Sequence, residues 1–508
     1  MLNEMKSMLN EMKSMLNMKT TENGAVAYGS TLNEVLDMFA FGGAYRQRTD
    51  AEVIELFNKA LIRDEALAMK CLFWIRDVRG GAGERRFFRV AMKWLANTYP
   101  EVARRNLVHV PEYGRFDDLY VFVGTPLQDE AMTMLSRQLL ADMVVEFPSL
   151  AGKWAKSCNA SSKDSRYLGE ITRSYMNMTP REYRRVLSAL RERLNVLERL
   201  MSGKRFDEID FSKLPSVAGM RYSHCFSTRE ELKERYAEFM AKPESKVNAA
   251  TLFPYDCAVK AIKVDHMPYG STEREAVNKF WANLPDYIGE NDASNFMCVC
   301  DTSGSMTWAN HNPLPIDVAT SLSIYFAERA KGPFHNHYIS FASRPQLIEI
   351  TGRDFVEKVN RIRRAGLCDN TNLQAVFDML LALAKRGVPA EDFVKKLFII
   401  SDMEIDQATN ELWDGYNRYN RQTWNRDNAF KSLMERIREN WERQTSIPFP
   451  QLYYWNVNAR NDTVLDLGPN VSYISGANPS ILKQVLSGKT GWDLCLETLL
   501  SERYAPIH

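Results

Sequence analysis

The chain has 508 residues, of which 45% are hydrophobic and 25% charged, and its formal net charge is +1. This length exceeds what one core usually accommodates, so we expect two or three globular domains. The near-zero net charge gives no overall indication of a nucleic-acid partner, so any such surface must be a local patch. Neither a bilayer-spanning apolar run nor a signal-peptide pattern is found, and scattered cysteines fit a reducing compartment. We therefore expect a cytoplasmic protein with no membrane partner.

Residues 1–17 repeat a heptad, MLNEMKS twice and then MLN. Methionines fall at alternating spacings of four and three, as at the a and d positions of a coiled coil. The repeat covers fewer than three heptads, and short isolated helices are marginal in water. We therefore expect residues 1–23 to form a flexible tail, with oligomerisation through the heptads as the open alternative.

Residues 24–285 are expected to form a domain of successive helices. Apolar residues recur at helical spacing in segment after segment, and strand-like alternation is scarce. Helical hairpins in such number favour an α-helical repeat of the HEAT type, arranged as a ring or an open solenoid. Prolines and glycines at 241–290 indicate a linker with short helices. The main predicted helices are 31–41, 50–63, 67–78, 84–96, 130–147 and 179–201.

Residues 286–508 change to strands alternating with helices. Such alternation predicts a mainly parallel, doubly wound α/β sheet with right-handed crossovers. The predicted strands are 295–300, 336–341, 346–350, 396–401, 451–457 and 471–475, and the predicted helices include 315–330, 353–364 and 372–386.

Three loops of this second domain carry oxygen-bearing side chains. Asp301, Ser303 and Ser305 follow the first strand on alternate residues, Thr371 precedes a helix, and Asp402 ends the strand 396–401. In a doubly wound sheet the first and fourth strands flank the switch point, where ligands bind. Carboxylates and hydroxyls suit a hard cation such as Mg²⁺. The alternative is that the first loop only caps a helix.

These five residues resemble the metal-ion-dependent adhesion site of von Willebrand factor type A domains. The resemblance implies one Mg²⁺ or Mn²⁺ ion, with a coordination position open to an acidic group of a protein partner. Glu404 and Asp406 could tune the ion. An insertion at 407–430, rich in Trp, Tyr, Arg and Asn, follows the last loop and is expected beside the metal, either as a binding element or as a helix packed on its own domain.

The most distinctive stretch of the helical half is RDVRGGAGERR, residues 76–86. A helix and not a strand precedes its glycines, so it is not a dinucleotide-binding fingerprint. We interpret it as a helix end, a turn and a new helix start whose amides could meet phosphate. The alternative is a turn in which arginines pair with nearby acids. The candidate RNA-binding residues are Arg76, Arg79, Arg85, Arg86, Lys153 and Lys156.

RDVRGGAGERR, PEYGRFDDL (111–119), the basic segment around Trp154 and PSVAGMRY (215–222) resemble TROVE proteins, the family of the Ro autoantigen, and in particular an uncharacterised branch of that family. The resemblance covers nearly the whole chain. It implies a helical-repeat ring closed by a von Willebrand factor type A domain. It also implies binding of small structured RNA on a basic surface and of single-stranded RNA ends in the ring.

The sequence therefore predicts a non-enzymatic, ring-shaped RNA-binding protein with a divalent-cation site. The alternative is a metal-dependent protein assembly module that binds no RNA. A metal-assisted hydrolase is less favoured, because His224, His335 and His337 are isolated and no general base has a convincing spacing.

Overall fold

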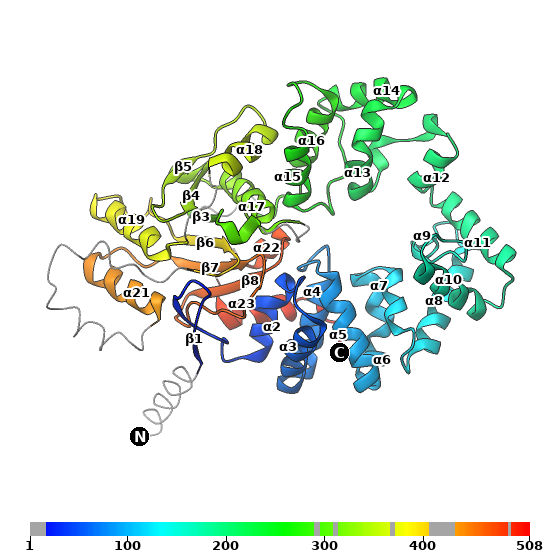
Figure 1. Cartoon of the computed structure of the whole chain (residues 1–508), viewed down its shortest axis with the longest axis horizontal. Helices are drawn as coiled ribbons and strands as arrows, with labels where there is room; N and C mark the ends of the chain where they lie inside the picture. Colours follow the sequence, from blue (N-terminus) through cyan, green and yellow to red (C-terminus); the bar gives the residue numbers. More distant parts are fainter. Residues whose placement is uncertain (1–16, 289–294, 308–312, 366–370, 406–431, 486–488) are drawn as a thin grey trace.

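The computed structural model describes residues 17–288, 295–307, 313–365, 371–405, 432–485 and 489–508. Helices occupy the chain from residue 34 to residue 282, and a six-stranded sheet with flanking helices follows (Figure 1). The predicted insertion at 407–430 and nearly all of the heptad repeat lie outside the described residues. Residues 18–20, which the prediction placed in the tail, form strand β1 (Met18–Thr20), which pairs with β2 (Val26–Tyr28).

The helical half packs short helices side by side around a continuous apolar core. Its helices are α2 (Glu34–Phe41), α3 (Asp50–Arg63), α4 (Glu65–Arg76), α5 (Arg85–Thr98), α6 (Pro100–Asn106), α7 (Val110–Tyr113), α8 (Gln128–Asp142), α9 (Ala151–Trp154), α10 (Lys163–Tyr175), α11 (Pro180–Arg193), α12 (Leu197–Ser202), α13 (Ser216–Thr228), α14 (Glu230–Ala241), α15 (Pro254–Lys263) and α16 (Thr272–Ala282).

Helix boundaries follow local chemistry. The helix predicted over 179–201 is split into α11 and α12 because Asn195 adopts a left-handed conformation, φ 48°. The helix predicted over 130–147 ends early, at Asp142. There the Arg193 guanidinium donates to the carbonyls of Asp142 and Met143 at 2.6 and 3.0 Å, which satisfies the free end of α8.

The α/β half contains one sheet with strand order β5-β4-β3-β6-β7-β8. Only the edge strand β5 is antiparallel to its neighbour. The central strands are apolar on both faces because helices cover both, as in other parallel sheets. The elements are β3 (Phe296–Asp301), α17 (Pro315–Arg329), β4 (His337–Phe341), β5 (Leu347–Glu349), α18 (Phe355–Ala365), α19 (Leu373–Lys385), β6 (Lys396–Ser401), α21 (Leu433–Gln444), β7 (Gln451–Asn456), β8 (Val471–Ser475), α22 (Leu482–Val485) and α23 (Gly491–Leu499).

The strand order confirms the predicted doubly wound sheet. The chain winds outward from β3 through β4 to β5, returns to β6 on the other side of β3, and then continues to β8. The switch point therefore lies between β3 and β6, whose residues pair in parallel register from Phe296–Lys396 to Cys300–Ile400. The carboxyl ends of these two strands carry Asp301 and Asp402, so the topology brings both acids to one crevice.

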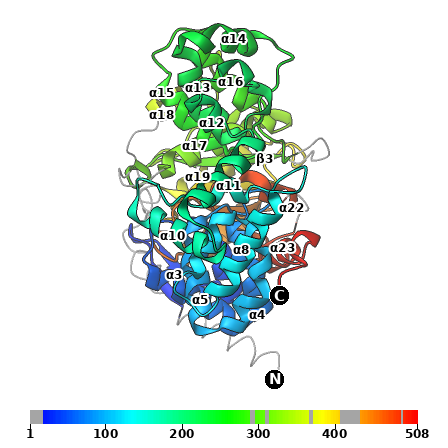
Figure 2. The ribbon, with the colours of Figure 1, turned by 90° about the vertical axis from the view of Figure 1, so that its right-hand side faces the viewer.

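The helical half forms an arc whose two ends both pack on the α/β half, so the two halves together make a closed ring and not an open solenoid (Figure 1). Figure 2, seen along the plane of the ring, shows α13–α16 and α2–α5 at opposite ends of the α/β domain. At the far end, Trp281 of α16 stacks on Phe355 of α18, with ring centroids 3.8 Å apart, and donates to Glu328 at 2.8 Å. Arg274 and Asp354 add a buried ion pair at 2.6 Å. The segment predicted as a linker at 241–290 thus contains two docked helices, α15 and α16.

At the other end of the helical half, near the end of α4, the ring is closed by the last residues of the chain. Asp77, at the end of α4, is buried and accepts hydrogen bonds from Arg503 at 2.8 Å and from the Tyr504 hydroxyl at 3.1 Å. The Tyr113 ring stacks on the Tyr504 ring, with centroids 5.7 Å apart. Asn478, beyond β8, donates to the carbonyls of Val78 and Gly81. We call this set of contacts the C-terminal latch.

The glycines of the 80–83 turn allow this contact. A Cβ atom on Gly81 would lie 1.8 Å from the Trp74 carbonyl oxygen, so the turn can fold back on α4 only with glycine there. Gly43 has the same role against β8, where a Cβ atom would lie 2.7 Å from the Ser475 carbonyl oxygen. The RDVRGG sequence is therefore explained by close packing in the ring closure.

The latch makes a prediction about stability. Arg503→Ala leaves the buried Asp77 carboxylate with the Arg79 backbone N–H and the Tyr504 hydroxyl as donors but with no counter-ion. We expect a loss of about 2 kcal/mol, discounted because Arg503 is partly exposed. Denaturant unfolding followed by tryptophan fluorescence measures it. The control is Arg105→Ala, which breaks an exposed ion pair with Glu65 and should cost at most about 0.5 kcal/mol. Equal effects of the two substitutions would contradict a structural role for the latch.

Candidate metal centre

Asp301 lies at the last position of β3, fully buried, and both of its carboxylate oxygens are engaged. Oδ1 accepts the backbone N–H of Ser303 at 2.9 Å, and Oδ2 accepts the Ser401 hydroxyl at 2.5 Å from the end of β6. The Ser303 and Ser305 hydroxyls lie 3.0 Å apart. The first loop is therefore wound tightly around one carboxylate and presents two hydroxyls beside it.

Asp402 follows β6 and is equally buried. Its Oδ1 accepts the Glu404 backbone N–H at 3.3 Å, while its Oδ2 has no hydrogen-bond partner among the described residues. Met403 takes a left-handed conformation, φ 67°, which turns the chain sharply after the strand. An unsatisfied buried carboxylate oxygen is costly, so it indicates a site for a cation or another donor.

The third predicted loop reaches the second through Glu404. The Thr371 hydroxyl donates to the Glu404 carbonyl at 2.9 Å, and Thr371 is buried. Asp402 is linked to the first loop by a hydrogen bond from Ser305 and by the field of Asp301. The structure thus brings the five predicted residues into one neighbourhood, with Thr371 beside the Asp402 loop. Asp406 lies outside the described residues.

Two carboxylates so close together without a cation perturb each other. Burial, and then the charge of Asp301, raise the pKa of Asp402 to about 7, although the Ser305 hydrogen bond opposes the shift. The metal-free site therefore resists holding both acids ionised. A divalent cation would remove that cost.

The donor set suits a hard divalent cation that keeps some of its water. It offers two carboxylates and three hydroxyls, all oxygen, with the unpartnered Asp402 Oδ2 among them. Within the described ranges no cluster of three or more His, Cys, Asp or Glu side chains could hold a metal. The described residues therefore do not form the Cys- and His-rich ligand set that is typical of a zinc site.

The predicted RNA-binding residues of the 76–86 stretch differ in exposure and in their partners within the protein. Arg76 is 4% exposed and donates two hydrogen bonds to the buried Asp118 at 2.9 and 2.7 Å, so it is a core ion pair and not a surface ligand. Arg86 donates to the Arg48 carbonyl at 2.5 Å and pairs with Asp50. Arg79 and Arg85 are exposed. The sequence pattern missed these acids because they lie dozens of residues away.

Lys153 and Lys156 belong to a mixed cluster around Trp154. The Arg115 guanidinium lies 3.8 Å from the Trp154 ring centroid and the Lys153 ammonium 5.5 Å. Lys156 lies 3.9 Å from Asp117. Partial burial, then the charges of Arg115 and Arg89, lower the pKa of Arg85, which places that guanidinium in the same positive field. Arg89 and Arg115 were not among the predicted contacts, although Arg115 lies in the quoted PEYGRFDDL motif and Arg89 lies three residues beyond RDVRGGAGERR.

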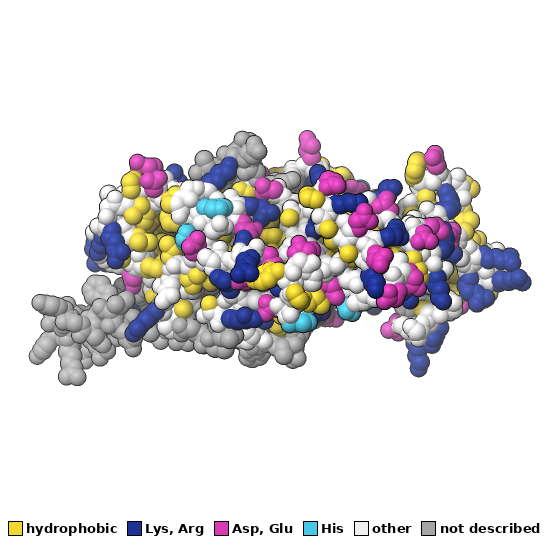
Figure 3. All heavy atoms as spheres, turned by 90° about the horizontal axis from the view of Figure 1, so that it is seen from above, with side chains coloured by type: hydrophobic (Ala, Val, Ile, Leu, Met, Phe, Trp, Pro, Cys, Tyr) yellow, Lys and Arg dark blue, Asp and Glu magenta, His cyan; other side chains and the backbone are white. Residues whose placement is uncertain are grey.

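A second basic surface was not predicted at all. Arg181, Arg184 and Arg185 are exposed on α11, and no ion pair to them is found among the described residues. Figure 3 shows charges of both signs interspersed over most of one face, with Lys and Arg side chains gathered at the end of the molecule where α11 lies. Three arginines within five residues, RxxRR at 181–185, were the available signal.

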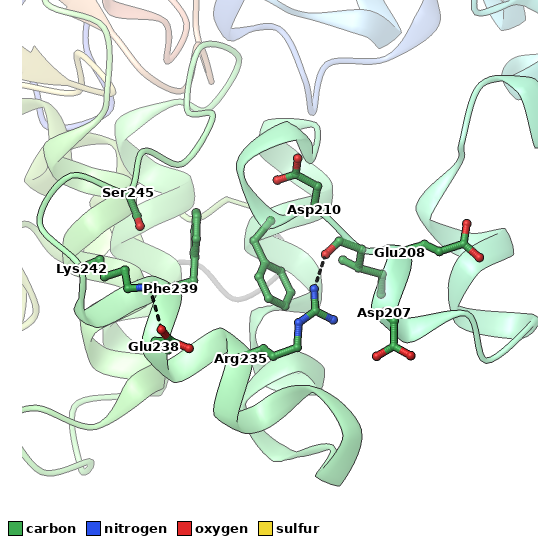
Figure 4. Close-up of a pocket in the computed structure, with 10 residues that line it drawn as sticks. Asp207, Glu208, Asp210, Arg235, Glu238, Phe239, Lys242 and Ser245 are labelled. Atoms are coloured by element: carbon green, nitrogen blue, oxygen red, sulfur yellow. Dashed lines mark hydrogen bonds and ion pairs between the residues drawn. The ribbon is translucent and has the colours of Figure 1, made fainter.

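An open pocket of about 380 Å³ lies beside α14 (Figure 4). Three of the acidic side chains that line it have partners: Glu238 accepts from Lys242 at 2.7 Å, Glu208 pairs with Arg205, and Asp210 pairs with Lys213. The Arg235 guanidinium donates hydrogen bonds to the carbonyls of Phe206 and Ile209. These charged side chains are therefore engaged in contacts within the protein.

The raised pKa of Asp402 makes a prediction for metal-free protein. An unfolded Asp has a pKa of about 3.9, so between about pH 4 and pH 7 the unfolded chain is deprotonated at this residue while the folded chain holds the proton. The stability from this group therefore falls as pH rises through that window. With chelator present, Asp402→Asn should be more stable than wild type at pH 8, by on the order of 2 kcal/mol, and equal to it near pH 4.

Thermal melts across this pH range measure the effect. Asp392→Asn, at an exposed carboxylate of the same half, is the matched control and should leave the pH profile unchanged. A constant difference between Asp402→Asn and wild type at all pH values would contradict the assignment.

None of the helices in the described part of the chain has the length and apolar character needed to cross a membrane. A protein of Acanthamoeba polyphaga mimivirus, uncharacterized protein L728, is 28% identical over 514 residues, covering 92% of this chain and 84% of its own. The crystal structure of the Deinococcus radiodurans Ro (RSR) protein superposes with a TM-score of 0.49 at 15% identity, covering 90% of this chain and all of that one.

Two families match the chain. The domain of unknown function DUF7788 matches residues 295–497, which hold the sheet and the candidate metal centre. The domain of unknown function DUF2828 matches residues 21–142 and 148–291, which hold the helical ring and together make more than half of the chain. The chain therefore belongs to the DUF2828 family.

Proposed function

We propose that the protein is a non-enzymatic, ring-shaped RNA-binding protein whose α/β half holds one Mg²⁺ or Mn²⁺ ion at Asp301, Ser303, Ser305, Thr371 and Asp402. The observation that carries the metal site is the buried Asp402 Oδ2, for which the described residues supply no hydrogen-bond donor and which lies near the buried Asp301 carboxylate. Since only some ligands come from the protein, the cation would keep waters, one of which an acidic group of a partner could replace.

RNA binding is supported by the unpaired arginines of α11 and by the basic cluster around Trp154. Arginine suits phosphate because its planar guanidinium offers two parallel donors. The resemblance of the helical motifs to TROVE proteins supports the same ligand class. The contact set differs from the first prediction. Arg76 and Arg86 are withdrawn because they pair with acids of the protein. The residues kept are Arg79, Arg85, Lys153 and Lys156, and those added are Arg115, Arg181, Arg184 and Arg185.

A metal-dependent protein assembly module without RNA is the second candidate. The observation that favours it is the pairing of Arg76, Arg86 and Lys156 with acids inside the protein, together with the net charge of +1. The two functions differ in response to conditions. RNA binding weakens steeply as salt rises, whereas a carboxylate bound to the cation is released by chelator at any salt concentration.

The metal site predicts stabilisation by divalent cations. Millimolar Mg²⁺ or Mn²⁺ should raise the melting temperature of wild-type protein, by an amount that grows with concentration because only the folded state holds the ligands together. Asp301→Asn should abolish this shift, since it removes a ligand while keeping the side-chain volume. Asp392→Asn should retain the full shift, and a shift that survives in Asp301→Asn would place the cation elsewhere.

The α11 surface predicts salt-dependent RNA affinity. Replacing Arg181, Arg184 and Arg185 together with glutamine should weaken binding of a short single-stranded RNA at least tenfold and reduce the slope of log affinity against log salt by roughly 2 to 3. Fluorescence anisotropy at several salt concentrations gives both quantities.

The control for the α11 variant removes the same charge from Lys59, Lys233 and Lys242, which are already paired with glutamates. It should change the affinity little. If wild-type protein ignores RNA even at low salt, the RNA proposal is wrong and the assembly module takes its place.

A further inference from the structure

One guanidinium lies between the candidate metal centre and the amino-terminal segment. Arg460, in the loop after β7, places Nη1 3.7 Å from Asp402 Oδ2 and Nη2 2.5 Å from Glu22 Oε2. Its side chain is 20% exposed, whereas Asp402 is fully buried. Arg460 therefore divides its charge between an acid inside the site and an acid outside it.

The contact with Asp402 is an ion pair without a hydrogen bond. Oδ2 has no donor within hydrogen-bond range in the described chain, although the guanidinium lies 3.7 Å away. Arg460 thus offsets the charge of Asp402 and leaves that oxygen free for a closer ligand. By contrast, both oxygens of Asp301 already accept hydrogen bonds.

Glu22 is held firmly on the other side of the guanidinium. Its backbone N–H donates to Glu404 Oε2 at 2.7 Å, and the Asn461 amide donates to Glu22 at 3.2 Å and to Glu404 at 3.1 Å. Thr21 and Asn23 donate to the carbonyls of Ile405 and Glu404 at 2.5 and 2.7 Å. The amino-terminal segment is therefore fastened to the Asp402 loop at four points.

We propose that Arg460 is a positioning residue that serves as the internal counter-ion of the metal-free centre and competes with the divalent cation for Asp402. Glu22 holds the guanidinium when Asp402 releases it, so the amino-terminal segment sets the affinity of the centre. This inference rests on the proposed cation site. It assigns to that site a built-in competitor and a residue that relieves the competition.

The balance of charge at the centre, with and without a cation, supports the exchange of Arg460 between Asp402 and Glu22. Without Arg460 the metal-free centre would hold two carboxylates in a buried space, at a high electrostatic cost. With a divalent cation present, a guanidinium 3.7 Å from a ligand oxygen repels that cation. Each condition therefore favours a different partner for Arg460, and Glu22 is an acid that already contacts its guanidinium.

The experiment measures the affinity of full-length protein for Mn²⁺ by electron paramagnetic resonance at fixed pH and salt. Arg460→Gln should bind Mn²⁺ at least tenfold more tightly than wild type, because the competitor is gone. Arg460→Lys keeps the charge and should stay within about threefold of wild type. The remote Arg364→Gln, which removes an exposed arginine of α18, should bind like wild type.

Glu22→Gln gives an effect of opposite sign. With the charge of Glu22 removed, the guanidinium is held less strongly on the outer side and stays nearer Asp402, so Mn²⁺ binding should weaken about threefold or more. In the double variant Arg460→Gln with Glu22→Gln this loss should vanish, because there is no guanidinium left to retain. An equal loss in both backgrounds would show that Glu22 acts only through the general field and would overturn its role.

The two proposals fail in different ways. If wild type binds Mn²⁺ through Asp301 and Arg460→Gln binds no more tightly, the competition is wrong and the cation site stands. If Arg460→Gln binds Mn²⁺ and wild type does not, competition is complete and the inference holds in its strongest form. If neither binds, both proposals are overturned.

Discussion

A buried carboxylate at the end of α4 ties the last residues of the chain to the helical ring. Asp77 cannot be hydrated where it lies, so its negative charge requires both Arg503 and Tyr504. Those two partners come from the segment after α23, and they bring the Tyr113–Tyr504 stack and the turn at Gly81 with them. Satisfying this one group therefore joins α4 to the end of the chain and closes the ring on this side.

The metal centre meets the same constraint in another way. Asp301 and Asp402 come together because β3 and β6 are neighbours at the switch point, and nothing in the strand pairing supplies a positive charge for them. The Ser303 backbone N–H and the hydroxyls of Ser305 and Ser401 solvate part of the charge. Arg460 supplies a partial counter-charge from a loop that also contacts the amino-terminal segment. The fold thus builds a site that is well formed and electrostatically incomplete.

Much of this architecture could be predicted from the sequence. The strands 396–401 and 471–475 and the helix 50–63 were predicted with their observed bounds, because each is a strongly apolar or strongly periodic run. The convergence of Asp301 and Asp402 was predicted because strand order in doubly wound sheets is restricted. The local residue pattern was enough to predict the element bounds, and the topological rule was enough to predict that the two acids meet.

The remaining features depend on contacts between distant residues, which one sequence does not display. Arg76 looked like a phosphate ligand because its partner Asp118 lies 42 residues away. The RDVRGG stretch was interpreted as a possible phosphate-binding turn. The folded ring instead pairs its Asp77 with Arg503 and its Gly81 carbonyl with Asn478, both about 400 residues later in the chain. Arg460 drew no notice in the sequence because it has no motif, and its importance comes only from the two acids on either side of it.

The latch also fixes an order of events during synthesis. Asp77 and Arg503 are separated by 426 residues, so the helical half leaves the ribosome long before the segment that closes it. At about 5–20 residues per second, that interval is roughly 20 to 85 seconds. During this time α2 and the glycine turn after α4 present an apolar seam with no sheet to cover it. The helical half therefore stays open until the C-terminal segment is synthesised. A chaperone that binds exposed apolar surface would act on the protein during that interval.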